Sequence, residues 1–243
     1  MQAIVLAGGL GTRLRGTIGE TPKPLAPVRG RPFLEYLLDY WIGQGVTRFI
    51  LSVGYKHEAI AGHFGATFEG AAIRYAVEDR PLGTGGGLLL AAGHLAGDGA
   101  FLVLNGDTFF EAPLGALREF HEARGALATI ALFRSRQGGR YAGLTLGESG
   151  EVLTLGAGER GGLANGGVYF MERSLFEGGP WRAASPVSLE EDILPFALRS
   201  RKRVFGLECA GRFLDIGVPE DYARAAELLS DRESRITNHG SKR

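Results

Sequence analysis

Cysteine is nearly absent from this chain. Its 243 residues include a single cysteine, Cys209, which excludes an internal disulfide, and no group of cysteines and histidines has zinc-site spacing. An excess of charge of either sign is also missing, because Lys and Arg total 27 and Asp and Glu total 27. A neutral chain lacks the global field that attracts nucleic acid or an anionic membrane, so we expect neither partner. Any phosphate binding must use local charge.

Long hydrophobic runs are lacking as well. No apolar stretch approaches the ~20 residues of a membrane span, and the first residues lack the basic and then apolar segments of a signal peptide. We therefore expect a cytoplasmic protein without a membrane segment. No repeat or linker divides the chain, which predicts one domain over residues 1–229. Residues 230–243 are polar without an apolar period, which predicts a disordered tail.

The most informative stretch spans residues 3–14 (AIVLAGGLGTRL). It begins apolar on both faces, as is typical of a buried parallel strand. Gly8, Gly9 and Gly11 then let main-chain N–H groups approach a ligand closely. Successive N–H groups form a concave anion site, and Arg13 adds a positive charge. This pattern predicts a phosphate-binding loop at the carboxyl end of the first strand; the alternative is a strand-to-helix turn whose glycines serve packing alone.

Two common phosphate-binding motifs are excluded. A P-loop requires a lysine directly after the glycines, and none follows here. A dinucleotide-binding fingerprint requires a third glycine where this chain has Leu14. It also requires an acidic residue after the second strand, where residues 53–55 read VGY. The loop therefore belongs to some other class of phosphate site.

A lysine between two prolines follows, within residues 16–31, where the prolines predict a loop without helix. Pro22 and Pro24 stiffen the backbone on both sides of Lys23. A stiff backbone suits a lysine that must reach a fixed target. The alternative is a solvated lysine with no partner.

A second glycine-rich stretch occupies residues 80–87 (RPLGTGGG). It follows a strand expected at 72–78 and precedes a helix expected at 88–95. Two such turns at one edge of an open α/β sheet would face a single crevice, where these sheets bind ligands. The alternative is a flexible loop.

Two aspartates end predicted strands. Asp107 closes the turn Asn105-Gly106-Asp107 after a strand expected at 100–104, and Asp215 precedes a helix expected at 220–229. Mg²⁺ takes oxygen ligands, commonly one or two carboxylates plus substrate phosphates. Asp107 is therefore a candidate Mg²⁺ ligand, and the alternative is an ordinary turn, in which these residue types are frequent.

The rest of the sequence also predicts an α/β fold. After the helix expected at 113–124, short strands joined by polar turns predict an antiparallel excursion instead of another βαβ unit. Ser188 is expected to cap a helix, with Glu191 at the capping-box position. The other expected elements are helices at 32–45 and 56–64 and strands at 48–54, 127–133, 143–146, 151–155, 165–170 and 203–208.

Five motifs, taken in order, resemble the sugar-1-phosphate nucleotidyltransferase family. The resemblance covers residues 1–229 and implies a Rossmann-like mixed, mainly parallel sheet flanked by helices, with a small antiparallel excursion for the sugar site. It also implies that a nucleoside triphosphate and a sugar 1-phosphate are joined with release of pyrophosphate, with Mg²⁺ as cofactor. The motifs are Gly8-Gly9-Leu10-Gly11-Thr12-Arg13-Leu14, Lys23-Pro24, Pro81-Leu82-Gly83-Thr84-Gly85, Asn105-Gly106-Asp107 and Asp215-Ile216-Gly217-Val218-Pro219.

The resemblance also implies roles for single residues. Catalysis falls to Arg13, Lys23 and Asp107, and Mg²⁺ binding to Asp107 and Asp215. The nucleotide-binding residues are Leu6, Ala7, Gly8, Gly9, Gly11, Thr12, Arg13, Leu82, Gly83, Thr84 and Asn105. The residues that bind the sugar phosphate are Gly143, Glu159, Arg160, Asn165 and Asp215.

Two departures from the family pattern occur in the sugar-binding segments. A frequent Glu-Lys-Pro reads Glu159-Arg160-Gly161, whose arginine can still bind phosphate with two donors. A Tyr-Gly pair reads Tyr141-Ala142-Gly143, which displaces the glycine by one position.

A finer resemblance, over residues 31–40, 51–58 and 163–169, is to enzymes that transfer GMP from GTP to D-glycero-α-D-manno-heptose 1-phosphate. It implies a role in making GDP-heptose for lipopolysaccharide or capsule. Composition and spacing select neither guanine nor heptose, so mannose 1-phosphate guanylyltransferase and uridylyl or thymidylyl relatives stay open. A non-catalytic nucleotide-sugar sensor is the alternative from a different class. The oligomeric state, a homodimer included, is open.

Overall fold

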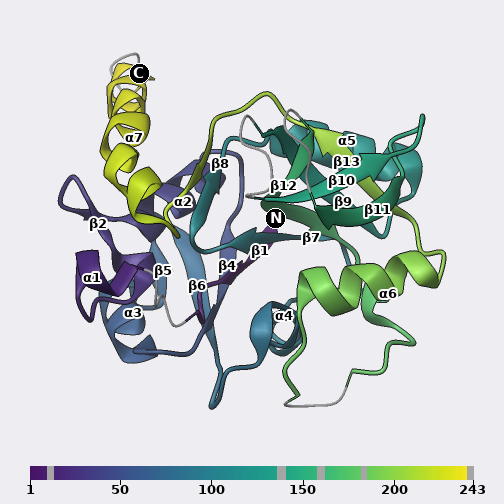
Figure 1. The fold of residues 1–243 in the computed structure, drawn as a ribbon. Helices are drawn as coiled ribbons and strands as arrows, with labels where there is room; N and C mark the ends of the chain where they lie inside the picture. The colour runs from purple at the N-terminus through teal and green to yellow at the C-terminus, as the bar shows by residue number, and fades with distance from the viewer. Residues whose placement is uncertain (10–13, 136–140, 158–161, 182–184, 240–243) are drawn as a thin grey trace.

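The centre of the molecule is a parallel sheet. The computed structural model describes residues 1–9, 14–135, 141–157, 162–181 and 185–239, and ten strands of this part form one mixed sheet. Its middle runs in the order β7 (Phe101–Asn105), β1 (Gln2–Leu6), β4 (Arg48–Val53) and β6 (Ala71–Val77), all parallel (Figure 1). Residues 3–5 of β1 are fully buried, as the apolar run predicts for a strand covered on both faces.

The other half of the sheet is largely antiparallel. β12 (Leu163–Met171) pairs antiparallel with both β7 and β9 (Ala128–Arg134). β10 (Ala142–Leu146) pairs antiparallel with β12 and with β11 (Val152–Ala157), whereas β13 (Val204–Glu208) lies parallel to β9. The predicted mixed sheet with an antiparallel excursion is confirmed.

Short strands complete the sheets at their margins. β5 (Thr67–Phe68) pairs antiparallel with β6 at the edge of the central sheet. β8 (Thr108–Phe110) and β14 (Phe213–Asp215) form a separate antiparallel pair, as do β2 (Pro27–Val28) and β3 (Arg31–Pro32). The β8–β14 pair brings the two predicted aspartate turns together.

Helices cover both faces of the central sheet. Alternate residues of β1 show this: Val5 belongs to the buried cluster that includes Trp41, and Ile4 to the cluster that includes Leu88. Because side chains alternate along a strand, one strand supports two cores. The helices are α1 (Arg15–Ile18), α2 (Phe33–Ile42), α3 (His57–Phe64), α4 (Gly83–Ala92), α5 (Leu114–Arg124), α6 (Leu194–Arg199) and α7 (Pro219–His239), with short turns η2 (Lys23–Leu25), η3 (Arg173–Phe176) and η4 (Leu189–Ile193).

Three sequence-based boundaries are wrong. α4 begins at Gly83, not at residue 88, so the second glycine-rich stretch is helical and not a loop. Residues 16–31 contain part of the one-turn helix α1 and the turn η2, because the prolines begin only at residue 22. α7 continues from Pro219 to His239, beyond the end expected at residue 229. The division into a domain over 1–229 and a tail stays a prediction.

The predicted helix cap at Ser188 is confirmed in part. The Ser188 hydroxyl accepts a hydrogen bond from the N–H of Glu191 at 3.0 Å. The reciprocal bond of the capping box is different, because the N–H of Ser188 donates to Oδ2 of Asp192 at 2.7 Å. The turn that follows, η4, is a π-helix, which places the reciprocal carboxylate one residue later than predicted.

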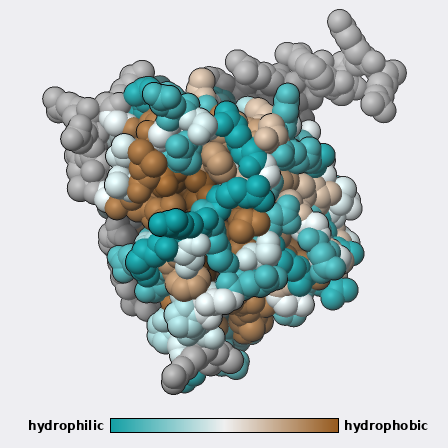
Figure 2. Space-filling view, turned by 90° about the vertical axis from the view of Figure 1, so that its right-hand side faces the viewer, coloured by the Kyte–Doolittle hydropathy of each residue, from teal (hydrophilic) through white to brown (hydrophobic). Residues whose placement is uncertain are grey.

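One face of the molecule carries both hydrophilic and hydrophobic side chains. Figure 2 shows the face at the right of Figure 1, where a hydrophobic patch lies among hydrophilic side chains. In the described part of the chain, Leu153 is the most exposed large hydrophobic side chain, at 54%. None of the helices described is both long and apolar enough for a membrane span.

Candidate active site

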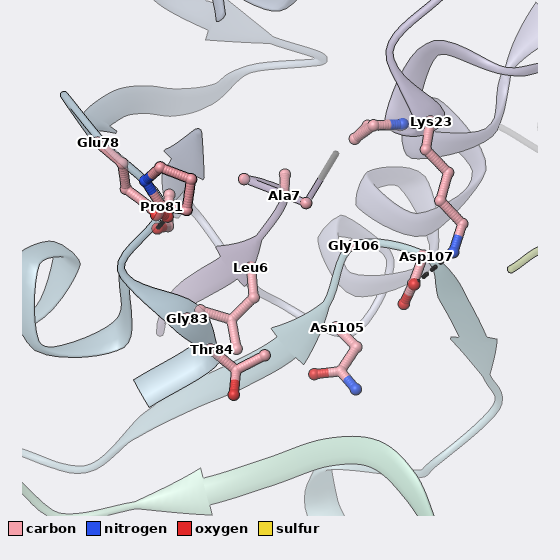
Figure 3. A pocket seen from close by; sticks show the side chains of 14 residues that line it. Leu6, Ala7, Lys23, Glu78, Pro81, Gly83, Thr84, Asn105, Gly106 and Asp107 are labelled. Atoms are coloured by element: carbon pink, nitrogen blue, oxygen red, sulfur yellow. Dashed lines mark hydrogen bonds and ion pairs between the residues drawn. The ribbon is translucent and has the colours of Figure 1, made fainter. Parts of the chain in front are cut away.

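The carboxyl ends of the parallel strands surround a cavity of about 310 Å³ (Figure 3). Three connections supply half of its lining residues: the residues after β1, the segment between β6 and α4, and the turn after β7. Segments far apart in the sequence meet here because parallel strands end at one sheet edge. The lining residues are Leu6, Ala7, Gly8, Gly9, Lys23, Pro24, Ser52, Glu78, Pro81, Gly83, Thr84, Asn105, Gly106 and Asp107.

The first glycine-rich stretch lies where it was predicted, at the carboxyl end of β1. The N–H of Ala7 donates to the carbonyl oxygen of Ser52 at 2.8 Å, which extends the pairing of β1 with β4. A Cβ at Gly8 would collide with the carboxylate of Glu78, whereas Gly9 has open space around it. Gly8 therefore permits a close approach between the backbone and the Glu78 carboxylate, which a side chain at this position would prevent. The predicted residues Gly11, Thr12 and Arg13 lie outside the described residues.

The second glycine-rich stretch forms the first turn of α4. Gly83 has a φ of 73°, and a Cβ there would lie 2.6 Å from the carbonyl oxygen of Val187. The N–H groups of Gly85 and Gly86 donate to that same oxygen at 2.8 and 3.0 Å. These glycines let the segment before η4 pack against the helix, so close packing is the main explanation for glycine at these positions. Gly83 and Thr84 line the cavity, as predicted.

Glu78, directly after β6, lines the cavity but has no counterpart among the sequence-based predictions. Its Oε1 accepts from the Ser52 hydroxyl and its Oε2 from the N–H of Leu82, both at 3.0 Å. Each oxygen keeps a further lone pair for a ligand. Figure 3 shows Glu78 at the opposite end of the cavity from Asp107. An acidic residue at a strand end is the signal that identified Asp107, and the same signal could have found Glu78. Leu82, predicted to bind nucleotide, is 7% exposed and does not line the cavity.

Lys23 and Asp107 form an ion pair at the other end of the cavity. The distance from Lys23 Nζ to Asp107 Oδ2 is 2.5 Å, and the two side chains are 13% and 43% exposed. The alternative of a solvated lysine without a partner is therefore wrong. Asn105 lines the cavity next to the pair, and its buried Oδ1 has no hydrogen-bond partner among the described residues.

A second cavity of about 230 Å³ adjoins the first and shares Lys23, Asn105 and Asp107 with it. The antiparallel strands and β14 supply much of its remaining lining. Two residues predicted to contact the sugar phosphate, Asn165 and Asp215, lie here. The other lining residues are Thr108, Tyr141, Gly167, Glu190, Phe213 and Gly217.

The other predicted sugar-phosphate residues are not in this lining. Gly143 is buried within β10, paired with Ala164 of β12, and Tyr141 lines the cavity in its place. Glu159 and Arg160 lie outside the described residues. The displaced Tyr-Gly pair thus puts the aromatic ring, and not the glycine, at the cavity.

Asp107 and Asp215 come together through the β8–β14 pair. Asp215 pairs with Thr108, the residue after Asp107, and the N–H of Ile216 donates to the carbonyl oxygen of Asp107 at 3.0 Å. The Oδ1 of Asp215 accepts from the N–H of Gly217 at 2.6 Å. Two carboxylates on one cavity fit a Mg²⁺ ion that completes its shell with phosphates and water. No cluster of three His, Cys, Asp or Glu side chains suited to a metal exists in the described chain, so substrate oxygens would be needed.

Comparison with known proteins is consistent with this geometry. Residues 2–232 match the family model described as Nucleotidyl transferase. The chain is 37% identical over 233 residues to D-glycero-alpha-D-manno-heptose 1-phosphate guanylyltransferase from Aneurinibacillus thermoaerophilus, covering 94% of this chain and 98% of the relative. It is 33% identical to mannose-1-phosphate guanylyltransferase from Mycobacterium tuberculosis, over 94% of this chain and 64% of that protein. The crystal structure of HddC from Yersinia pseudotuberculosis, complexed with GMP-PN, matches with a TM-score of 0.81 at 31% identity, covering 94% and 99% of the two chains.

Proposed function

The chain belongs to the nucleotidyl transferase family, and we propose that it transfers GMP from GTP to D-glycero-α-D-manno-heptose 1-phosphate. An oxygen of the sugar phosphate attacks the α-phosphorus of GTP, and the bond from that phosphorus to the β-phosphate oxygen breaks. The products are GDP-heptose and pyrophosphate. One observation carries the proposal: two adjoining cavities share the Lys23–Asp107 pair, where two phosphate-bearing substrates can meet.

The chemistry asks for charge and positioning, not for a covalent nucleophile. A sugar phosphate oxygen is already ionised at neutral pH, so no side chain has to remove a proton from it. The obstacle is the repulsion between two anions that must align, which fixed cations and precise placement overcome. We assign to Lys23 the neutralisation of charge between the two phosphates. Arg13, outside the described residues, is proposed to stabilise the departing pyrophosphate.

Asp107 and Asp215 are the proposed Mg²⁺ ligands. A bound Mg²⁺ supplies positive charge that offsets the phosphates and orients them. The two carboxylates face one cavity, and Lys23 lies close enough to Asp107 to hold that carboxylate in place. Lys23 thereby positions Asp107 before substrates bind, and the N–H of Gly217 holds Asp215 through its Oδ1 at 2.6 Å.

Glu78 supports guanine as the base. Guanine presents two adjacent donors, N1–H and the N2 amino group, which match the two oxygens of a carboxylate. Uracil and thymine present one N–H between two carbonyl oxygens, and a carboxylate repels those oxygens. Because the hydrogen bonds from Ser52 and Leu82 fix Glu78, the site discriminates through a preplaced negative group.

The polar lining of the second cavity supports a sugar phosphate as acceptor. Asn165, Glu190 and Thr108 offer donors and acceptors suited to hydroxyl groups. The two guanylyltransferase relatives differ in the sugar they are named for, and the greater identity, 37% against 33%, favours heptose over mannose. Mannose 1-phosphate is the second candidate.

A substrate panel tests the proposal. Purified protein with Mg²⁺ is incubated with each of GTP, ATP, UTP, CTP and dTTP, combined with heptose 1-phosphate, mannose 1-phosphate or glucose 1-phosphate. We expect pyrophosphate release to be fastest with GTP and heptose 1-phosphate. Faster release with mannose 1-phosphate would make mannose 1-phosphate, and not heptose 1-phosphate, the acceptor. No release from any pair would overturn the enzyme assignment in favour of a nucleotide-sugar sensor.

A further inference from the structure

A buried tyrosine links the two cavities beneath their surface. Tyr169 of β12 has no exposed surface, and it is absent from the lining of both cavities. Its hydroxyl accepts from Nδ2 of Asn165 at 2.8 Å and donates to Oε1 of Glu190 at 3.1 Å. Both neighbours line the second cavity. The tyrosine therefore holds an amide and a carboxylate of the proposed sugar site without touching the sugar.

The connection continues into the first cavity. The other oxygen of Glu190, Oε2, accepts from the Thr84 hydroxyl at 2.8 Å, and Thr84 lines the first cavity. The Thr84 hydroxyl in turn accepts from the N–H of Leu189 at 2.8 Å. A continuous set of hydrogen bonds thus runs from Thr84 through Glu190 and Tyr169 to Asn165.

The direction of every bond in this set is fixed. A hydroxyl carries one proton, so Thr84 and Tyr169, which each accept a bond, must each donate to Glu190. The carboxylate of Glu190 accepts from both hydroxyls, and its Oε2 also accepts from the Ser188 hydroxyl at 3.4 Å. Burial and the charge of Glu190 raise the pKa of Tyr169 well above its ordinary value, so its proton stays in place. Buried hydrogen bonds linked in this way strengthen one another, so the loss of one bond weakens the others.

We propose that Tyr169 is a positioning residue that couples nucleotide binding in the first cavity to sugar-phosphate binding in the second. This inference rests on the proposed function. GTP contacts at the Thr84 end fix Glu190, and Glu190 through Tyr169 fixes Asn165 for the sugar phosphate. A ligand changes the affinity for another only through differential interactions of this kind, and the effect is reciprocal.

Binding measurements test the coupling with a GTP analogue whose α–β bridging oxygen is replaced by a methylene group, because the proposed reaction cannot cleave that bond. Isothermal titration calorimetry gives the Kd of the analogue alone and in the presence of saturating heptose 1-phosphate, in Mg²⁺ buffer. For the unmodified protein we expect heptose 1-phosphate to lower the Kd of the analogue by about tenfold, which is within the usual range of coupling between two sites. Tyr169→Phe, which removes only the linking oxygen, should reduce that factor to below about threefold, because the hydrogen-bonded path is cut. The Kd of the analogue alone should change by less than about twofold, since Tyr169 contacts no nucleotide.

Two further variants complete the experiment. Thr84→Val breaks the same path at its other end and should also reduce the coupling factor to below about threefold, which keeps the test valid if Tyr169→Phe folds poorly. Tyr36→Phe is the matched control, because its buried hydroxyl donates to the carbonyl oxygen of Val28 at 3.1 Å, outside both cavities; it should retain full coupling. Full coupling in Tyr169→Phe, or independent binding of the two ligands to the unmodified protein, would overturn the inference. Neither result requires loss of pyrophosphate release, so it is distinguishable from failure of the proposed function.

Discussion

The ammonium group of Lys23 lies 2.5 Å from the carboxylate of Asp107, at the junction of two cavities. Lys23 comes from a turn stiffened by Pro22 and Pro24, and Asp107 from the turn after β7, 84 residues later. Each charge keeps the other in place until phosphates arrive. A lysine that is 13% exposed would otherwise leave a charge with little solvation.

Replacement of Asp107 by asparagine tests its proposed role as Mg²⁺ ligand. Asp107→Asn keeps the size of the side chain but removes the negative charge, so we expect turnover with Mg²⁺ to fall by at least about 100-fold. The measurement is pyrophosphate release under saturating substrates. The fold should be retained, but the melting temperature should fall, because Lys23, which is 13% exposed, loses its charged partner. Turnover near that of the unmodified enzyme would refute the metal role.

Exchange of Glu78 for glutamine tests base selection. Glu78→Gln replaces one acceptor by an amino group that opposes a guanine donor, so kcat/KM for GTP should fall by roughly 10- to 100-fold. The same amino group can donate to a uracil carbonyl, so kcat/KM for UTP should rise relative to GTP. Competition assays with both nucleotides measure the ratio.

The neighbouring carboxylate provides the control for this exchange. Asp79→Asn makes the same charge change one residue later, at an exposed position that does not line the first cavity. It should leave the GTP-to-UTP ratio unaltered. An equal effect of both variants would show that net charge near the site, and not the placement of Glu78, controls the preference.

An alanine at Gly83 tests the packing of α4 against the segment before η4. Gly83→Ala must adopt a φ of 73° with its Cβ 2.6 Å from the Val187 oxygen. We expect the free energy of unfolding to fall by about 2 kcal/mol or more, because backbone strain and a clash add. Gly97→Ala is the control: its φ is 70° but nothing lies near its Cβ, so it should lose only about 1 kcal/mol. Urea titrations measure both, and equal losses would contradict the packing argument.

How far the sequence predicts this structure depends on the kind of signal. Local patterns identified the buried strand before Gly8, the lysine between prolines and the aspartate at the end of β7, since each depends on neighbours in the chain. The prediction that Gly85 and Gly86 belong to a turn is wrong, because glycine is needed there for the contact of α4 with Val187, about 100 residues away. A long-range contact of this kind leaves no local pattern to read.

The candidate site shows the same limit. Glu78 and Glu190 become notable only when folding places them beside other segments, Glu78 against Ser52 and Glu190 against Thr84 and Tyr169. In the sequence, Glu190 is one of three consecutive acidic residues in a helix start, where a structural role suffices. Distance in the sequence, and not an unusual residue type, hid these two carboxylates.

Stability should fall at mildly acidic pH because of one buried histidine. His121 is 2% exposed, with Nδ1 2.9 Å from the Thr129 hydroxyl and Nε2 3.6 Å from a carboxylate oxygen of Glu172. Burial lowers the pKa of His121 from 6.5 to about 4. Below pH 6.5 His121 therefore binds a proton in the unfolded chain but not in the folded chain. The free energy of unfolding falls as the pH drops through this range. Between pH 7 and pH 5 we expect a loss of about 2 kcal/mol from this residue.

Urea unfolding at pH 7 and pH 5 measures this loss, and two variants isolate it. His121→Gln cannot titrate, so its stability should change less between the two pH values than that of the unmodified protein. His94→Gln, at an exposed position, should leave the pH dependence unaltered. Glu172 also faces His121, and burial raises its pKa; this opposes the histidine, since a raised carboxylate pKa favours the folded state as pH falls. A pH dependence in His121→Gln as steep as in the unmodified protein would show that other groups control acid stability.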